Sequence, residues 1–199
     1  MSTTTSPTVL PAGIWAVDPS RSRVGFAVRH SGAARVRGEF GDFEGVLEID
    51  DRLGTATVRG TVRLASVNTS EPRRDDHLRS KDFFDAEQYP DLTFESTRIE
   101  ALGGKSFLLT GNVTLHGVTN EVVLRAEVKA AQADMSGIER VGLEVTGTLS
   151  RRDYGLKFKR ALRSGNALVA DCVDLVLGVS VKKQACRDVP PPPSARHLA

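Results

Sequence analysis

Apolar and polar residues alternate along most of this 199-residue chain, and a period of two is typical of strands that bury one face. Val24, Phe26 and Val28 share one face of such a segment, and Arg29 lies on the other. The same alternation predicts strands at 47–50, 56–64, 107–115, 122–128, 141–146 and 173–181, with short ones at Ile14–Asp18 and Leu92–Ile99. The pattern therefore predicts about eight or nine strands.

The segments between these strands are short and rich in turn residues, which suits antiparallel neighbours. Such links lie at 50–54, 102–105 and 116–118. Only Glu71–Phe83 reads as a helix. Ser70 is its predicted N-cap, and Pro72 falls in the first turn, where its missing N–H costs nothing.

Each predicted strand has one apolar face that must be buried against another element, and the sequence predicts no further helices that could bury it. The sheet must therefore close on itself or fold into a sandwich, and we predict an all-β antiparallel barrel of about eight strands. Such a barrel is either filled by side chains or able to hold one small ligand. Gly60, Gly111 and Gly147 interrupt the apolar faces, which indicates either curvature or the close approach of a ligand or another backbone.

Composition places the chain among ordinary globular proteins, with 40% hydrophobic and 26% charged residues. Residues 1–12 and the Pro-rich tail 185–199 are predicted to be disordered, which leaves one domain at 13–184. No apolar run approaches the roughly 20 residues of a membrane-spanning helix, and the first residues lack the pattern of a signal peptide. We therefore expect a cytoplasmic location. A net charge of +2, without interleaved aromatic residues, argues against a nucleic-acid partner.

Cysteine and histidine predict no metal site, no disulfide framework and no cofactor. Cys172 falls in a strand pattern and Cys186 in a polar tail. No two histidines have the i, i+2 or i, i+4 spacing of a shared metal ligand set; they are His30, His77, His116 and His197. We expect them to be structural or to lie at the rim of the barrel.

Two charged clusters are candidates for chemistry. The segment Arg73–His77 resembles an Asp–His acid–base pair, but the chain has no Gly-x-Ser-x-Gly nucleophile, so a solvated helix face is favoured and no catalytic residue is assigned. The run Arg151–Arg160, with Arg163, is strongly basic. A solvated loop is the favoured interpretation, and the alternative is a basic rim that meets an anionic head group or transiently contacts a membrane surface.

Eight short motifs follow one another along the chain and together carry a resemblance to a known family. They are Trp15–Pro19, Val24–His30, Val36–Gly45, Arg74–Asp85, Tyr89–Pro90, Leu92–Ser96, Gly111–Thr119 and Ser150–Gly155. Together they resemble the YceI-like family, polyisoprenoid-binding proteins with an extended lipocalin-like barrel. The resemblance covers about residues 13–183. It implies a lipocalin-like barrel that binds a long isoprenoid chain, as a polyprenyl lipid, a prenyl phosphate or the tail of a quinone, and that acts as a carrier or sequestering protein without catalysis.

The resemblance also implies which residues bind the lipid. The inward residues expected to line the tube are Phe26, Val28, Phe40, Phe43, Leu47, Val58, Val62, Phe94, Phe107, Leu109, Val113, Leu143 and Val145. A mouth or lid is expected at His77, Leu78, Phe83 and Phe84, and His30 is included among the ligand-binding residues. These assignments follow strand parity, so a slip of one residue would invert a strand.

The chain departs from the family pattern in two ways that bear on function. Tyr154 stands where the family usually has Phe, and Lys157–Arg160 is richer in charge than is usual. That charge predicts a preference for an anionic head such as a prenyl diphosphate. Two alternatives stay open: an enzyme acting on a quinone or lipid amide in the same cavity, with His30 or His77 in a polar pair, and an interaction module with a filled barrel. A sheet edge left exposed could also pair in a homodimer.

Overall fold

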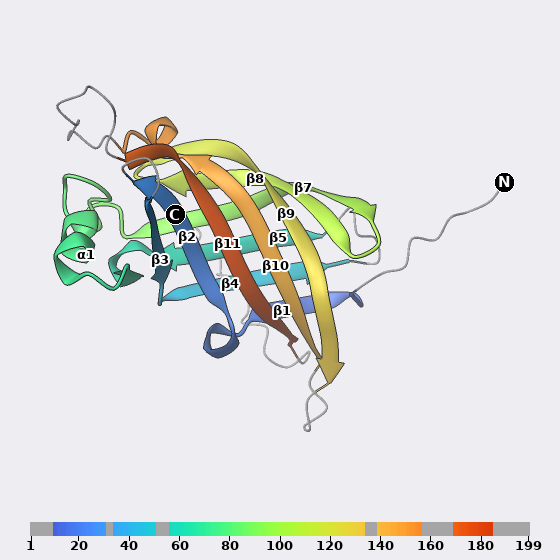
Figure 1. The fold of residues 1–199 in the computed structure, drawn as a ribbon. Helices are drawn as coiled ribbons and strands as arrows, with labels where there is room; N and C mark the ends of the chain where they lie inside the picture. Colours follow the sequence, from blue (N-terminus) through green and yellow to red (C-terminus); the bar gives the residue numbers. More distant parts are fainter. Residues whose placement is uncertain (1–9, 31–33, 51–55, 134–138, 157–168, 185–199) are drawn as a thin grey trace, which may run out of the picture.

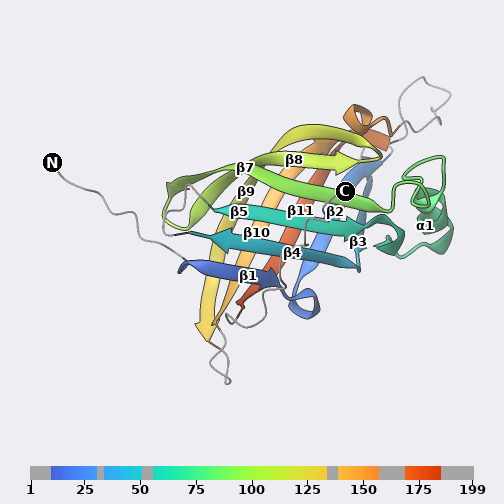
Figure 2. The same cartoon turned by 180° about the vertical axis from the view of Figure 1, so that it is seen from behind.

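The computed structural model describes residues 10–30, 34–50, 56–133, 139–156 and 169–184, and these form one antiparallel sheet of eleven strands (Figures 1 and 2). The strands are β1 (Gly13–Val17), β2 (Arg23–His30), β3 (Ala34–Phe40), β4 (Phe43–Ile49), β5 (Thr57–Arg63), β6 (Val67–Asn68), β7 (Asp91–Gly103), β8 (Ser106–Leu115), β9 (Val118–Ala133), β10 (Glu139–Ser150) and β11 (Val169–Lys183). The helical elements are η1 (Pro19–Arg21), η3 (Leu64–Ser66), α1 (Pro72–Arg79) and η4 (Arg151–Tyr154). No helix within these described ranges is both long and apolar enough to cross a membrane.

Eight of the strands close into a ring in the order β1-β4-β5-β7-β8-β9-β10-β11, because β1 also pairs with β11 from Trp15↔Lys183 to Val17↔Val181. The predicted closed antiparallel barrel is confirmed. Strands β2, β3 and β6 form a branch that leaves the ring at the same edge of β11, where β2 pairs with residues 169–178. The strands number more than the alternation predicted, because β3 and the two-residue β6 carry no clear period-two pattern of their own.

Strand parity places the core inside the ring, as successive side chains of a strand face opposite sides of the sheet. On β9, Val122 is 9% exposed while its neighbour Val123 is 52% exposed. Trp15 of β1 is 1% exposed, and its indole Nε1 donates to the carbonyl oxygen of Pro11 at 3.1 Å. Its polar edge is thus satisfied while its rings pack against the core.

Two of the three glycines singled out in the sequence mark close approaches. A Cβ on Gly111 would lie 2.6 Å from the ring of Phe94, and one on Gly147 would lie 2.4 Å from Leu124. At Gly60 the only atom within 4 Å would be a carbonyl oxygen at 3.7 Å, so this position has room for a side chain. Gly111 is therefore required for the aromatic ring to lie against the neighbouring strand.

The helix α1 is shorter than predicted and begins one residue later. It ends at Arg79 rather than Phe83, because the backbone of Ser80 is extended, with φ −68° and ψ 170°, although its N–H still donates to the carbonyls of Asp76 and His77. The N-cap is Glu71, not Ser70: its carboxylate accepts from the N–H groups of Arg73 and Arg74 at 3.3 and 2.7 Å.

The Ser70 N–H is already bonded to the side chain of Asn68 at 2.8 Å, and its φ of 62° is unlike the extended backbone of a cap. This local turn explains why the first of two suitable capping residues is not used.

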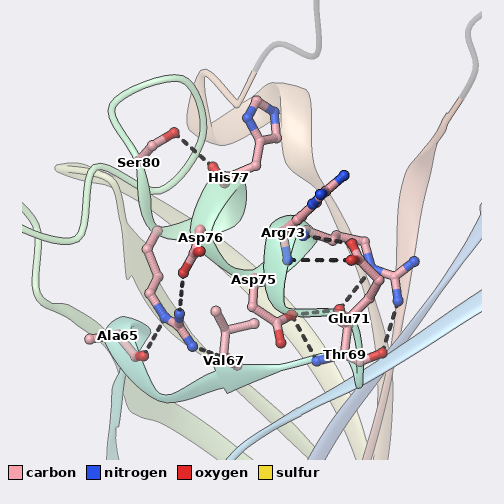
Figure 3. A network of polar contacts seen from close by, with 11 residues as sticks. Ala65, Val67, Thr69, Glu71, Arg73, Asp75, Asp76, His77 and Ser80 are labelled. Carbon is pink, nitrogen blue, oxygen red and sulfur yellow. Dashed lines mark hydrogen bonds and ion pairs between the residues drawn. The ribbon is translucent and has the colours of Figure 1, made fainter.

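A polar network fixes α1 to β6 (Figure 3). The buried carboxylate of Asp75 accepts hydrogen bonds from the N–H and the hydroxyl of Thr69 at 2.9 and 2.5 Å. Arg79 donates to the carbonyls of Ala65 and Val67 at 2.8 Å each. These hydrogen bonds tie the helix to η3, β6 and the residue that follows β6.

Candidate lipid-binding site

The interior of the closed ring contains a cavity of about 240 Å³, which we call the inner chamber. Its wall is almost wholly apolar and is built from inward-facing side chains of the ring strands, together with Phe26 and Phe40 of the branch. The barrel is therefore hollow, and the alternative of an interior filled by side chains does not describe it.

A second cavity of about 430 Å³, the outer chamber, lies at the end of the barrel that carries α1. The branch strands, α1, the segment 83–84 and η4 contribute to its wall. Figures 1 and 2 both show α1 and the short turn of η4, coloured orange, at this end. The surface of the inner chamber is almost wholly apolar although Glu44, Arg59 and Thr61 contribute to its wall, whereas the outer chamber is more polar. The polar residues that line the outer chamber are Thr69, Glu71, Arg73, Arg74, His77, Arg151 and Tyr154.

The two chambers adjoin at a ring of shared side chains that we call the neck, formed by Phe26, Phe40, Leu92, Leu149 and Leu175. The rings of Phe26 and Phe40 have their centroids 5.5 Å apart. Phe26 lies over Gly38, where a Cβ would come within 2.4 Å of the ring. Gly38 thus sets the position of one aromatic side of the neck.

Aromatic contacts continue from the neck into the outer chamber. The ring centroid of Phe40 lies 6.2 Å from that of Phe84, and the Phe84 centroid lies 4.9 Å from that of Phe83 in an edge-to-face arrangement. Such pairs are more favourable than area burial alone would give. They form a continuous aromatic path from the inner wall to the segment that follows α1.

The residues predicted as ligand-binding divide between the two chambers. Those in the wall of the inner chamber are Phe26, Phe40, Phe43, Leu47, Val58, Val62, Phe94, Phe107, Leu109, Val113, Leu143 and Val145. Those in the wall of the outer chamber are Phe26, Val28, Phe40, His77, Leu78, Phe83 and Phe84. His30 ends β2, but its side chain lies outside the described residues. Whether these residues contact a ligand stays a prediction.

The prediction omitted many wall residues. Apolar ones with the same parity include Val24, Leu124, Ala126, Val128, Leu175, Leu177, Val179 and Val181, so the alternation already carried the signal for them. It carried none for Leu10, which is buried against the inner chamber from a position before β1. Of the polar residues in the outer chamber, His77 was predicted as part of the mouth, and Arg151 and Tyr154 fell within the run given the alternative of a basic rim. Thr69, Glu71, Arg73 and Arg74 were missed, since Arg73–His77 was interpreted as a solvated face.

On the α1 side of the outer chamber, the polar groups bond mainly to one another. Arg74 donates through Nε to the Thr69 hydroxyl at 2.7 Å and through Nη2 to the Thr69 carbonyl at 2.8 Å. The carboxylate of Glu71 is used as the helix cap. His77 and Arg73 are exposed and form the rim; Figure 3 shows the His77 ring directed away from β6.

On the η4 side, two polar side chains are buried in the wall. Arg151 is 6% exposed and donates through Nε to the carbonyl of Ala170 at 2.8 Å. Burial lowers the pKa of its guanidinium, an effect that the nearby Asp171 opposes. Tyr154 is 1% exposed, and burial, followed by the charge of Asp153, raises the pKa of its phenol. The phenol is therefore a neutral hydrogen-bond donor at physiological pH.

The described part of the chain contains no group of three or more His, Cys, Asp or Glu side chains that could hold a metal ion. The acid–base interpretation of the Asp–His segment gains no support, because Asp75 is bonded to Thr69 and Asp76 to Arg79 at 3.1 Å. Of the basic run, Arg151 and Arg152 are described, and the predicted loop at 157–163 lies outside the described residues.

The sequence model of the YceI-like domain matches residues 15–181. The chain belongs to the YceI-like family. This YceI-like chain is 38% identical over 135 residues to a UPF0312 protein of Photorhabdus laumondii, covering 67% of this chain and 70% of the relative.

Solved structures show the same barrel. The Campylobacter jejuni YCEI protein matches the YceI-like chain with a TM-score of 0.68 at 28% identity, covering 79% of this chain and 90% of that one. A polyisoprenoid binding domain from Saccharophagus degradans matches with a TM-score of 0.66 at 17% identity, covering 85% and 98%. At that identity, the second likeness shows the fold alone.

Proposed function

We propose that this protein binds a single long apolar lipid of the isoprenoid class inside the barrel, and that it carries or sequesters this lipid without transforming it. The observation that carries the proposal is the pair of adjoining chambers, of about 240 and 430 Å³, joined at an apolar neck. A solid core would need no such space, since protein interiors leave few voids larger than a water molecule.

The chemistry of the lining supports an extended hydrocarbon ligand. The inner wall offers methyl groups and aromatic rings but almost no hydrogen-bonding group, so it favours a chain over a compact polar molecule. At about 0.3 kcal/mol per atom, a chain of about 40 carbons would gain on the order of 10 kcal/mol, which suffices for tight binding without any catalytic group. The Saccharophagus degradans protein that shares the barrel is a polyisoprenoid binding domain, and this agrees with the same class of ligand.

The enzyme alternative requires a polar pair inside the cavity. Of the two histidines proposed for it, His77 is exposed at the rim of the outer chamber. In the described chain, the polar side chains near the neck are not arranged as a nucleophile with a base. The geometry therefore favours binding over catalysis.

The test is native mass spectrometry of the purified protein, followed by organic extraction and identification of the lipid. We expect a co-purifying isoprenoid at one molecule per chain, and delipidated protein should take up added prenyl lipids. Protein that carries no lipid and refuses every added prenyl chain would refute the proposal.

A matched pair of variants shows whether the lipid enters the inner chamber. Ala126 is buried in its wall, whereas Arg125, the preceding residue of β9, is exposed. Ala126→Phe fills part of the chamber and should lower lipid occupancy severalfold, and Arg125→Phe should leave it unchanged. Equal occupancy in the two variants would place the lipid elsewhere.

A further inference from the structure

The wall of the inner chamber includes a residue that precedes the first strand. Of the described residues that line this chamber, all but Leu10 and Ala56 lie in strands. Leu10 stands three residues before the start of β1 and is only 6% exposed. Figures 1 and 2 both show that β1 begins at the end of the barrel opposite α1. Leu10 therefore lines the chamber at the end away from the neck.

The strand register places other apolar wall residues at the same end. β1 starts with the pair Gly13↔Ile49, so the end of β4 lies beside the start of β1. Ala56 immediately precedes β5, which pairs with β4 up to Glu48↔Thr57. Ile49 and Ala56 both line the chamber, and Ile49 belongs with Leu10 to the buried core cluster. The apolar wall thus continues from the strand ends onto Leu10.

The side chain of Trp15 fixes the segment that carries Leu10. Its indole Nε1 donates to the carbonyl oxygen of Pro11 at 3.1 Å, and the side chain itself is 1% exposed. The ammonium of Lys183 lies 5.8 Å from the centroid of the Trp15 ring. Between the strand and this segment stands Gly13, with a φ of 138° that residues with a side chain rarely adopt. The chain can therefore leave the line of β1 at Gly13 and be held in place by Trp15.

The two ends of the inner chamber differ as a consequence. The neck leads into the outer chamber, whose rim carries the exposed residues Arg73 and His77, whereas the other end has the buried Leu10 in its wall. An apolar tail that enters through the outer chamber and passes the neck would run towards Leu10.

We infer that Leu10 sets the upper limit on the length of the lipid tail that the inner chamber accepts, and that Trp15 is the positioning residue that keeps it there. The inference rests on the proposed function. Below the limit, each isoprene unit adds five buried carbons and should strengthen binding about tenfold. Above it, further carbons stay outside the inner chamber, so affinity should stop rising with tail length.

The experiment is a competition among prenyl alcohols that share one head group and differ by one isoprene unit each, from farnesol to solanesol. Delipidated full-length protein is incubated with an equimolar mixture, and the bound alcohols are extracted and quantified by mass spectrometry. We expect the bound amount to rise with tail length up to one preferred length and not beyond it.

Three variants test whether Leu10 sets this length. Leu10→Ala shortens the side chain at the chamber end and should raise the preferred length by one isoprene unit, so that the next longer alcohol gains about tenfold over the parent's preferred one. Leu10→Trp should lower the preferred length. Leu102→Ala is the matched control, because Leu102 near the end of β7 is 49% exposed, and it should leave the preferred length unchanged.

The role of Trp15 has its own test. Trp15→Phe keeps an aromatic ring in the core but removes the N–H that donates to Pro11, so it should raise the preferred length as Leu10→Ala does. A general loss of stability would lower the bound amount of every alcohol alike and would not move the preferred length. An unchanged preferred length in Trp15→Phe therefore overturns the positioning role.

The outcomes separate this inference from the proposed function. An unchanged preferred length in the Leu10 variants, or an equal shift in Leu102→Ala, overturns the inference and leaves lipid binding standing. Failure of the parent protein to bind any of the alcohols overturns the proposed function itself. Because Leu10→Ala and Leu10→Trp should move the preferred length in opposite directions, either variant decides the question if the other does not fold.

Discussion

An acidic residue placed on the inner face of the barrel should destabilise the protein in a pH-dependent way, and the same residue on the outer face should not. Strand β9 offers a matched pair of valines: Val122 is 9% exposed and Val123 is 52% exposed. Val122 packs in the core cluster that surrounds the inner chamber. The variants Val122→Asp and Val123→Asp differ by one position and by the side of the sheet they occupy.

The magnitude follows from the pKa of aspartate. An Asp with an ordinary pKa of about 3.9 that must stay neutral at pH 7 costs about 4 kcal/mol, at 1.36 kcal/mol per pH unit. A buried carboxyl without a partner and the lost valine contacts add about 2–4 kcal/mol. Val122→Asp should therefore lose about 6 kcal/mol or more at pH 7, which is comparable to the whole stability of a small domain.

The sign of the pH dependence is specific. Burial raises the folded-state pKa of the new carboxyl, so the ionisation cost vanishes below the unfolded pKa and grows as the pH rises above it. Urea unfolding followed by circular dichroism should give a loss of only about 2–4 kcal/mol for Val122→Asp near pH 4. Val123→Asp should stay within about 1 kcal/mol of the parent at both pH values. A pH-independent loss in Val122→Asp would mean that its carboxylate is hydrated and that the interior is not dry.

Two further predictions concern the frame of the barrel. Gly111→Ala should lower the free energy of unfolding in urea by about 1–3 kcal/mol, because a Cβ there would lie 2.6 Å from an aromatic ring. At Gly178 a Cβ would have no atom within 4 Å, so Gly178→Ala should stay within about 0.5 kcal/mol of the parent. Equal losses in the two variants would contradict the close approach at Gly111. Hydrogen bonds from Ser20 and Arg140 lower the pKa of Asp18 from 3.8 to about 2, so this carboxylate stabilises the fold above about pH 4 by at most about 2 kcal/mol and loses that contribution as the pH falls towards 2. Asp18→Asn should show a shallower loss of stability over that range, and parallel curves for the two proteins would refute the assignment.

The inner chamber could be read from the sequence because strand parity is a local property. Leu109, Val113 and Leu143 stand on the apolar side of an alternating pattern, and an antiparallel barrel turns that side inwards. Strand pairing, in contrast, depends on residues that are far apart in the sequence. The fork at β11, where one edge pairs with β1 at 181–183 and with β2 at 169–178, needs a strand longer than either partner and cannot be seen in any single segment.

The mouth at His77, Leu78, Phe83 and Phe84 was predicted, but most of the polar lining of the outer chamber was missed for a similar reason. Tyr154 and Arg151 lie in a short turn after β10, and Arg74 lies in α1 more than 70 residues earlier, so nothing in either segment indicates that they line one cavity. Arginines in a short charged helix are more often solvated, which is why the sequence favoured that interpretation. The predicted N-cap of α1 was wrong because Ser70 has a φ of 62°, held by the turn in which its N–H bonds to Asn68, and a cap needs an extended backbone.

The fork at β11 also separates the strands that build the two chambers. The closed ring alone builds most of the inner wall, whereas β2, β3 and α1 extend one side of the barrel beyond it and cover the outer chamber. Because Arg79 ties α1 to residues 65 and 67, the α1 part of the polar lining is held by a segment outside the closed ring, whereas η4 is held by the ring strands β9 and β11. The apolar wall of the inner chamber and the polar lining of the outer chamber are thus supplied largely by different parts of the fold, so substitutions in α1 can change the second while the ring strands that build the first stay the same.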